Sequence, residues 1–396
     1  MTQQDPIVIV GAARTPMGSF QGDLKEATAP ALGSVAIREA LSRAGVSGED
    51  VGEVIFGNVL PAGLGQAPAR QASLGAGVPQ SAGCTTINKM CGSGMKATML
   101  AHDLLIAGSA DVMVAGGMES MTNAPYLLPK ARGGMRLGHG QVIDHMFLDG
   151  LEDAYDKGRL MGTFAEETAT HYQFTRDAQD AFAIESLTRA QKAQADGTFE
   201  AEIAPITLKT RKGEVTVNLD EQPRTANPDK IPTLKPAFAK DGTVTPANSS
   251  SISDGAAALV LMRRSEAQRR GLTPLAEIVS HATHAQAPAW FTTAPVEAIR
   301  KCLDKAGWSK DAVDLYEVNE AFAVVAMAAM HDLDLPRDKV NIHGGACALG
   351  HPIGASGARI LVTLLNALKT YDLQTGVASL CIGGGEATAL AVKRLQ

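Results

Sequence analysis

The feature that most constrains the fold of this chain is a weak internal repeat. At one constant offset the first half matches the second, pairing Ile37-Arg38 with Ile299-Arg300, Ala44-Gly45 with Ala306-Gly307, Ser47 with Ser309 and Val51 with Val313. At nearby offsets further residues match, namely Cys91 with His351, Gly94 with Gly354, and Gly116, Gly117 and Glu119 with Gly383, Gly384 and Glu386. Self-similarity along a chain indicates repeated structural units. We therefore expect two similar halves that contribute facing loops.

Each half reads as alternating strands and helices. The expected strands are Ile7 to Val10, Val54 to Phe56, Thr85 to Ile87, Val112 to Ala115 (ending at Gly116-Gly117) and Gly376 to Leu380, and the expected helices are Ala29 to Ala44, a segment after Cys91, and Ala358 to Leu368. Such alternation is typical of α/β layers. A chain of 396 residues also exceeds what one hydrophobic core usually serves.

A segment of different amino-acid composition separates the two halves. From about Met118 to Asn248 the chain is rich in glycine, proline and charge. Within it, Thr175 to Gln194 is predicted to be an amphipathic helix with Thr175 as its N-cap and Asp177 in its first turn. The alternation of strand-like and helix-like segments returns toward Met262, and a second unit is expected to start around Ala276.

Charge and cysteine content exclude several classes of protein. A formal net charge of −6 gives no general attraction to nucleic acid or to anionic membranes. The 5 cysteines form no C-x-x-C pair, which argues for a reducing compartment and against a structural zinc site. Met1 to Pro6 leads directly into an apolar run, so no signal or transit peptide is expected. No apolar run approaches the length of a membrane span.

Cys91 lies where a helix is expected to begin, within N-K-M-C-G-S-G-M-K-A. The positive end of a helix favours thiolate over thiol, so we expect the pKa of Cys91 to lie below the value of about 8.5 for a free cysteine. An isolated cysteine is more often a buried structural residue. The flanking Gly92 and Gly94 favour the functional interpretation, because they suggest close approach of the backbone to a ligand.

Three further positions could complete a nucleophilic site. His351 lies in a glycine-rich turn at the counterpart of Cys91, and an imidazole beside a cysteine can act as its base, although a lone histidine is more often structural. Cys381 follows a strand and precedes Gly383-Gly384-Gly385, whose backbone N–H groups could face an oxyanion. Asn319 closes another strand-to-helix turn and can orient a water or a carbonyl without titrating.

Four strings together resemble the thiolase family, particularly its acetyl-CoA acetyltransferases. They are C-G-S-G after N-K-M, N-E-A-F-A at Asn319 to Ala323, G-H-P-I-G-A-S-G-A-R at Gly350 to Arg359, and C-I-G-G-G at Cys381 to Gly385. The resemblance runs from A-A-R-T-P near the start, through G-G-M-E-S-M, to the C-terminus. Each string is weak alone, but their order and spacing are specific.

The resemblance implies a five-layer α-β-α-β-α fold built from two similar halves. Residues 1–120, completed by about 249–275, would form the N-terminal half. Residues 121–248 would form a loop domain that binds CoA, and residues 276–396 the C-terminal half.

The implied activity is that of an acetyl-CoA C-acetyltransferase, which condenses two acetyl-CoA to acetoacetyl-CoA and CoA and catalyses the reverse thiolysis. Cys91 would accept the acetyl group, His351 would activate it, and Cys381 would move the α-proton as the second acid/base. His351 and a water held by Asn319 would form one oxyanion hole, and the backbone N–H groups of Cys91 and Gly383 the other. No metal or cofactor is expected beyond the CoA thioesters.

The resemblance also implies contacts to CoA. The positions concerned are Leu160, Met161, Arg224, Phe238, Ser250 and Phe322. Arg224 could pair with a phosphate, although a lone arginine in a polar loop is more often solvated. Two departures bear on chain length: Leu160 stands where short-chain members often have a histidine that bonds pantetheine, and Pro246 where they often have a small residue.

Several alternatives remain open at this stage. A 3-ketoacyl-CoA thiolase acting on longer chains would share the same catalytic residues, and an acyl-CoA-binding relative without activity should lack at least one of them. Ketoacyl synthases and hydroxymethylglutaryl-CoA synthases of the same fold use C-H-H or glutamate-dependent sites. A dinucleotide or phosphate loop is disfavoured because neither G-x-G-x-x-G after Val10 nor G-x-x-x-x-G-K-[ST] occurs. The resemblance further implies a cytoplasmic homo-oligomer, either a dimer or a tetramer.

Overall fold

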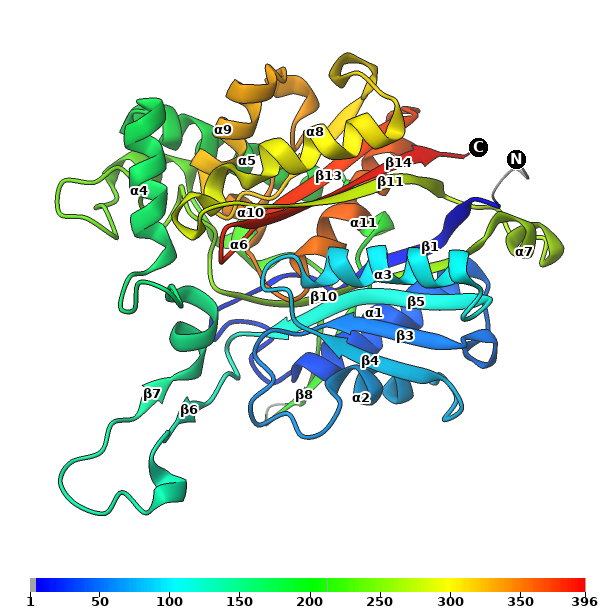
Figure 1. The fold of residues 1–396 in the computed structure, drawn as a ribbon, viewed down its shortest axis with the longest axis horizontal. Coiled ribbons are helices and arrows are strands. Elements are labelled where there is room, and N and C mark those ends of the chain that lie inside the picture. The colour runs from blue at the N-terminus through cyan, green and yellow to red at the C-terminus, as the bar shows by residue number, and fades with distance from the viewer. Residues whose placement is uncertain (1–4, 212, 396) are drawn as a thin grey trace.

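The computed structural model describes residues 5–211 and 213–395 (Figure 1). Its main sheet has the strand order β12-β13-β14-β11-β1-β10-β5-β3-β4, with a short β2 beside β10. The first half-sheet contains β1 (Ile7–Arg14), β2 (Gly18–Ser19), β3 (Glu53–Gly57), β4 (Gly83–Ile87), β5 (Val112–Ser120) and β10 (Ser253–Arg263). The second contains β11 (Ala276–Ala285), β12 (Leu315–Val318), β13 (Thr375–Ile382) and β14 (Glu386–Arg394). They join where Val8 pairs with Glu277 and Ile9 with Ala276 in β1 and β11.

Helices cover both faces of each half-sheet. Outside the inserted segment the helices are α1 (Ala29–Ala44), α2 (Pro68–Gly75), α3 (Ser93–Ala107), α7 (Arg264–Arg269), α8 (Ala294–Ala306), α9 (Ala323–Leu333), α10 (Ala346–Leu349) and α11 (Ser356–Thr370). Helices α3 and α11 pack against each other and against strands of both half-sheets, whereas α1 and α2 cover the outer face of the first half and α8 that of the second. The order is therefore α-β-α-β-α, and the expected five-layer fold is confirmed.

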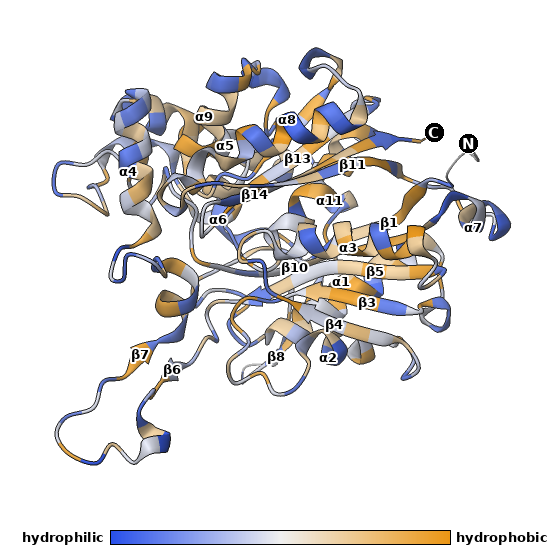
Figure 2. Cartoon of the chain, in the orientation of Figure 1, coloured by the Kyte–Doolittle hydropathy of each residue, from blue (hydrophilic) through white to orange (hydrophobic). Residues whose placement is uncertain are grey.

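Hydrophobicity follows these layers. Strands β3 and β5 and helix α3 are largely apolar, while α8 carries polar stretches along its length (Figure 2). The residues that α3 and α11 bury include Met95, Ala101, Ile360 and Leu364, all fully inaccessible. A helix that is buried between two sheets needs apolar side chains on opposite faces, unlike an outer helix with one apolar stripe. Among the described residues, no helix is long and apolar enough to cross a membrane.

The sequence repeat corresponds to equivalent elements in the two halves. Helices α1 and α8 end at Gly45 and Gly307, whose φ angles of 66° and 68° are left-handed. Such a C-cap favours glycine because a Cβ is strained there. Ser47 and Ser309 then each cap a short 3₁₀ turn with the side-chain oxygen. The halves therefore share helix, cap and turn in register, as the repeat predicts.

The match of Gly116-Gly117 with Gly383-Gly384 does not correspond to equivalent structure in the two halves. Gly116 and Gly117 do not end a strand, since β5 continues through them to Ser120. Gly383 and Gly384 instead form a turn after β13. The cause is tertiary: a Cβ on Gly117 would lie 2.0 Å from the carbonyl oxygen of Gly354, so glycine lets β5 pass close to the loop before α11.

The segment between β5 and β10 contains α4 (Met161–Tyr172), α5 (Arg176–Ala195) and α6 (Glu221–Thr225), together with the short pairs β6 (Tyr126–Leu127) with β7 (Ile143–Asp144) and β8 (Ile206–Thr210) with β9 (Gly213–Val217). Helix α5 begins after Thr175, whose side chain accepts from the backbone N–H of Ala178 as predicted. The β6–β7 arm extends away from the layered body, and α4 lies beside the C-terminal half (Figure 1).

Candidate active site

A cavity of about 670 Å³ lies between the two halves and the inserted segment. Most residues predicted to act on the substrate line it: Cys91, Leu160, Met161, Phe238, Ser250, Phe322, His351, Cys381 and Gly383. Each of the three catalytic candidates follows or ends a core element, since Cys91 comes after β4, His351 after α10, and Cys381 near the end of β13. Strands and short helices of the two halves thus converge on one site.

The turn that carries Cys91 is held by its own side chains. Met90 has a φ of 45°, an uncommon left-handed value for a residue other than glycine. Its backbone N–H donates to Asn88 Oδ1, and Ser93 Oγ donates to its carbonyl at 2.6 Å. Lys89 pairs with Glu386 at the start of β14 and so ties this turn to the opposite half. The strained conformation places the thiol directly before α3.

The expectation of a lowered pKa for Cys91 is wrong. Burial raises the pKa of Cys91 to about 11, although the backbone N–H groups of Gly383 and Cys91 act in the opposite direction. Desolvation disfavours the charged form of a thiol, and here it exceeds the effect of the helix start. Cys91 is therefore a neutral thiol at pH 7. The influence of the two N–H groups on its sulfur fits the oxyanion hole expected from the sequence.

The flanking glycines have a structural role that differs from the expected one. A Cβ on Gly94 would lie 2.7 Å from the backbone nitrogen of Ala358, and one on Gly92 would lie 2.3 Å from the side chain of Ile382. These glycines therefore let α3 approach α11 and β13 closely. The close approach of backbone that they indicate is to neighbouring elements of the protein, not to a ligand.

His351 is oriented as a neutral base. Its Nδ1 lies 2.5 Å from Ser356 Oγ, which is also 3.0 Å from the carbonyl of Pro352. A carbonyl can only accept, so the single hydroxyl proton goes to Pro352 and the imidazole donates from Nδ1. Nε2 is buried and has no hydrogen-bond partner among the described residues. Burial, assisted by the charge of Arg359, lowers the pKa of His351 to about 3, so Nε2 offers a free lone pair at pH 7.

Replacing Ser356 with alanine should slow acetylation by about five- to tenfold, the loss expected for one buried hydrogen bond of about 1 to 1.4 kcal/mol. The change would remove the acceptor that fixes Nδ1–H and would free the ring to tilt. Stopped-flow measurement of CoA release from acetyl-CoA would report the rate. Thr98→Val is the matched control, because the hydroxyl of Thr98 is buried in α3 and, among the described residues, donates to the Gly94 carbonyl alone. A rate for Ser356→Ala within twofold of the parent would contradict the assignment.

Cys381 is fully buried at the end of β13. Burial and the nearby Cys91 raise the pKa of Cys381 well above its ordinary value. It is thus protonated at rest, and its thiolate would be a strong base once formed. The following Gly384 and Gly385 have φ angles of 95° and 88°, which only glycine adopts readily. The turn leaves the backbone of Gly383 bare at the cavity wall.

Two predicted residues lie outside the described cavity lining. Asn319 is buried behind His351, with Nδ2 3.5 Å from Nδ1 of the ring and Oδ1 accepting from Arg359 at 3.2 Å. Because Nδ1 of His351 carries a hydrogen, the amide Nδ2 of Asn319 finds no acceptor there and only lies behind the ring. Its role in holding a water for an oxyanion hole stays a prediction. Arg224 is exposed and pairs with Asp23, so its guanidinium does not line the cavity. Sequence reasoning could not find this pair, because its members lie far apart in the chain.

Glu119 is a residue that sequence reasoning left without a role. Its buried carboxylate accepts from the backbone N–H groups of Val59, Leu60 and Gly354 at 2.8 to 3.0 Å and from Asn58 Nδ2 at 2.7 Å. Burial raises the pKa of Glu119 to about 7 despite these donors. The carboxylate joins the end of β3 to the loop that carries His351. The one sequence feature that could have pointed to this residue is that it is the only charged residue of the string G-G-M-E-S-M.

Comparison with known proteins identifies the family of this chain. A family model described as "Thiolase, N-terminal domain" matches residues 7–265, and one described as "Thiolase, C-terminal domain" matches residues 272–394. The chain belongs to the thiolase family. The resemblance drawn from the four sequence strings is thereby confirmed.

Individual thiolase relatives match over nearly the full chain. The acetyl-CoA acetyltransferase of Cupriavidus necator is 50% identical over 390 residues, which cover 98% of this chain and 99% of that protein. The cytosolic acetyl-CoA acetyltransferase of Mus musculus is 49% identical over 393 residues, 98% of each chain. The crystal structure of the Bacillus anthracis acetyl-CoA acetyltransferase superposes with a TM-score of 0.97 at 43% identity and covers 100% of both chains.

Proposed function

We propose that this thiolase is an acetyl-CoA C-acetyltransferase that works through an acetyl-cysteine intermediate. The observation that carries the proposal is the convergence of Cys91, His351 and Cys381 on one cavity. A nucleophile, a neutral base and a second acid/base are what the two half-reactions require. A protein that only binds acyl-CoA would need none of them.

The first half-reaction uses Cys91 and His351. As the thiol of Cys91 attacks the acetyl-CoA carbonyl, its proton passes to Nε2 of His351, which has no competing partner among the described residues. A carbon–sulfur bond forms to Cys91 and the bond to CoA breaks. The departing CoA thiolate takes the proton of Cys381, which leaves Cys381 as thiolate and His351 protonated. The N–H groups of Cys91 and Gly383 are proposed to bind the oxyanion.

The second half-reaction uses Cys381 as a base. Its thiolate removes a proton from the methyl group of a second acetyl-CoA, and the carbanion attacks the acetyl thioester on Cys91. The raised pKa of Cys381 makes this thiolate a stronger base than an ordinary one. Release of acetoacetyl-CoA leaves Cys91 as thiolate, which recovers its proton from His351. Thiolysis runs through the same steps in reverse. Thiol, imidazole and amide groups suffice, so we propose no cofactor or metal for the reaction.

We further propose that the CoA moiety lies along the inserted segment, residues 121–248, taken as a loop domain between the halves 1–120 with 249–275 and 276–396. Support comes from the apolar cavity wall at Leu160, Met161 and Phe238. Glycine at position 162 lets the ring of Phe238 pack closely against α4 at this wall, because a Cβ there would lie 2.3 Å from the ring. Ser250 and Phe322 complete the proposed contacts, while Arg224 could reach a phosphate only by leaving Asp23.

A cytoplasmic homo-oligomer, dimer or tetramer, is also proposed. The mouse relative named as cytosolic supports the location. The β6–β7 arm supports association, because it exposes apolar side chains that another copy could cover, including Tyr126, Leu128, Leu137 and Val142. Leu137 is 86% exposed.

A substrate series tests the function. We expect CoA-dependent cleavage of acetoacetyl-CoA with a kcat/KM at least about tenfold above that for 3-ketohexanoyl-CoA and longer chains, since added methylenes must find room in a site shaped for an acetyl group. The readout is loss of the 3-ketoacyl absorbance at equal enzyme concentration. Equal or faster cleavage of long chains would favour a β-oxidation thiolase. Binding of acyl-CoA without any turnover would overturn the enzymatic proposal.

A further inference from the structure

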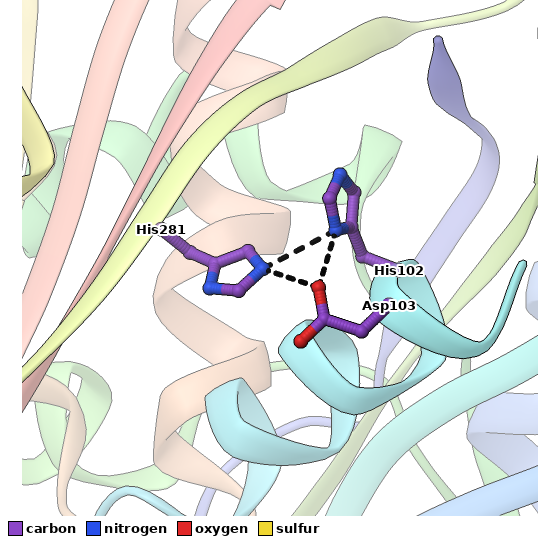
Figure 3. Close-up of side chains that lie close together, drawn as sticks. All are labelled: His102, Asp103 and His281. Atoms are coloured by element: carbon purple, nitrogen blue, oxygen red, sulfur yellow. Dashed lines mark hydrogen bonds and ion pairs between the residues drawn. The ribbon is translucent and has the colours of Figure 1, made fainter. Parts of the chain in front are cut away.

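A cluster of three potential metal ligands lies outside the active site. His102 and Asp103 belong to α3, and His281 projects toward them from β11 (Figure 3). His281 Nε2 lies 2.9 Å from Asp103 Oδ1 and 3.2 Å from His102 Nδ1, and these last two atoms are 3.0 Å apart. From the start of α3 to His102 the helix rises roughly 14 Å, so the cluster is separate from the Cys91 turn.

No placement of hydrogens on the two ring nitrogens makes all three contacts of the cluster favourable. The carboxylate of Asp103 only accepts, and each ring nitrogen can carry at most one hydrogen. If both nitrogens carry hydrogens, two N–H groups face each other at 3.2 Å. If one carries a hydrogen, the other faces the carboxylate with a lone pair, and if neither does, all three lone pairs converge. Every assignment leaves at least one repulsive contact, whereas a cation accepts all three lone pairs.

The spacing fits a transition-metal ion. Ligands held about 2.0 to 2.1 Å from a zinc ion are roughly 3.3 Å apart in tetrahedral geometry and roughly 3.0 Å apart at right angles. The observed separations of 2.9 to 3.2 Å lie close to this range. Two imidazoles and one carboxylate suit Zn²⁺, Co²⁺ or Ni²⁺, while Mg²⁺ prefers oxygen ligands.

Burial leaves the cluster open on one side. The side chains of His102 and His281 are 14% and 16% exposed, whereas that of Asp103 is 54% exposed. A bound ion would therefore have two shielded imidazole ligands and could take solvent molecules on the side of Asp103.

We propose that His102, Asp103 and His281 form a binding site for a divalent transition-metal ion of the zinc class, with its remaining positions open to solvent. The ion links α3 of the N-terminal half to β11, the first strand of the C-terminal half. Its role is structural, because it joins elements of the two halves at a place away from the cavity. The proposal is independent of the reaction, which uses neither histidine.

Metal titration of the chelator-treated full chain tests the site. Equilibrium dialysis should show one Zn²⁺ bound per chain, and at least about tenfold weaker binding in His281→Asn and in His102→Asn, because each removes one ligand. His331→Asn is the matched control. His331 Nδ1 also lies 2.9 Å from the carboxylate of the next residue, Asp332, but among the described residues this pair belongs to no three-ligand cluster. It should bind zinc like the parent chain.

Two further readouts separate this site from the thiols. Bound Co²⁺ should show visible d–d absorption without the near-ultraviolet charge-transfer band of thiolate ligation, and Zn²⁺ but not Mg²⁺ should raise the Tm of the parent and of His331→Asn only. Retained acetoacetyl-CoA cleavage by the His102 and His281 variants would show that they fold. Absence of zinc binding by the parent, unchanged binding by both variants, or a thiolate band would each overturn the proposal.

Discussion

Cys91→Ala is expected to lower kcat/KM for acetoacetyl-CoA cleavage by more than about 10⁴-fold, because it removes the atom that forms the covalent intermediate. His351 would keep its free Nε2 but would have no proton to take. The measurement is steady-state thiolysis at saturating CoA, with far-UV circular dichroism to verify folding.

Cys84→Ala supplies the matched control for this prediction. Cys84 is also a free and partly buried thiol, and it lies in β4 just before the Cys91 turn, but it does not line the cavity. Its replacement should leave kcat/KM within about twofold of the parent. A Cys91→Ala protein that retains more than a tenth of the activity would show that another group carries the acetyl.

Cys381→Ala should fail at a different step. Acetylation of Cys91 should persist after the change, because a thiolate is a good leaving group and the departing CoA thiolate can take its proton from protonated His351 or from water when the proton of Cys381 is missing. Condensation requires removal of the α-proton, and its rate should fall by at least about 10³-fold, within the range for loss of a positioned base. Single-turnover acetylation and exchange of the acetyl methyl protons with deuterated water measure the two steps separately.

Cys302→Ala controls for the loss of a buried thiol. Cys302 is fully buried in α8, and burial raises its pKa to about 11, but it lies outside the cavity. It should change neither acetylation nor exchange. Exchange at the parent rate in Cys381→Ala would contradict the assigned division of labour.

Local signals were enough to place most of the fold. Helix α1 was predicted with its observed bounds from its apolar periodicity and from Gly45 at its end, and in the structure Thr28 caps its start. Helix α5 likewise follows from Thr175. The two halves were predictable because the repeat preserves caps and turns, which act within a few residues. The extension of β5 was not, because it depends on the approach of Gly117 to Gly354 from the other half.

The identity of the catalytic residues was predictable, but their electrostatics were not. Cys91, His351 and Cys381 stand in recognisable glycine-rich turns. The pKa of Cys91 instead depends on how deeply two halves bury the thiol, which no local pattern records. The same holds for Ser356, whose role follows only from its contact with His351, and for Glu119, whose partners come from two loops far apart in the chain.

The metal-ligand cluster shows another limit of sequence reasoning. A search for paired cysteines found no zinc site, and no short spacing signals this one. His102 and Asp103 are adjacent, but His281 comes from a strand of the other half. Such a set is visible only after the chain has folded.

Mapping the acetyl group is the most direct test of the account. The protein would be incubated with acetyl-CoA alone, quenched in acid to preserve thioesters, digested and analysed by tandem mass spectrometry. The proposed mechanism predicts one acetyl group per chain on the peptide that contains Cys91, removed again when CoA is added before the quench. Acetylation of Cys381 or of any other residue, with Cys91 unmodified, would contradict it.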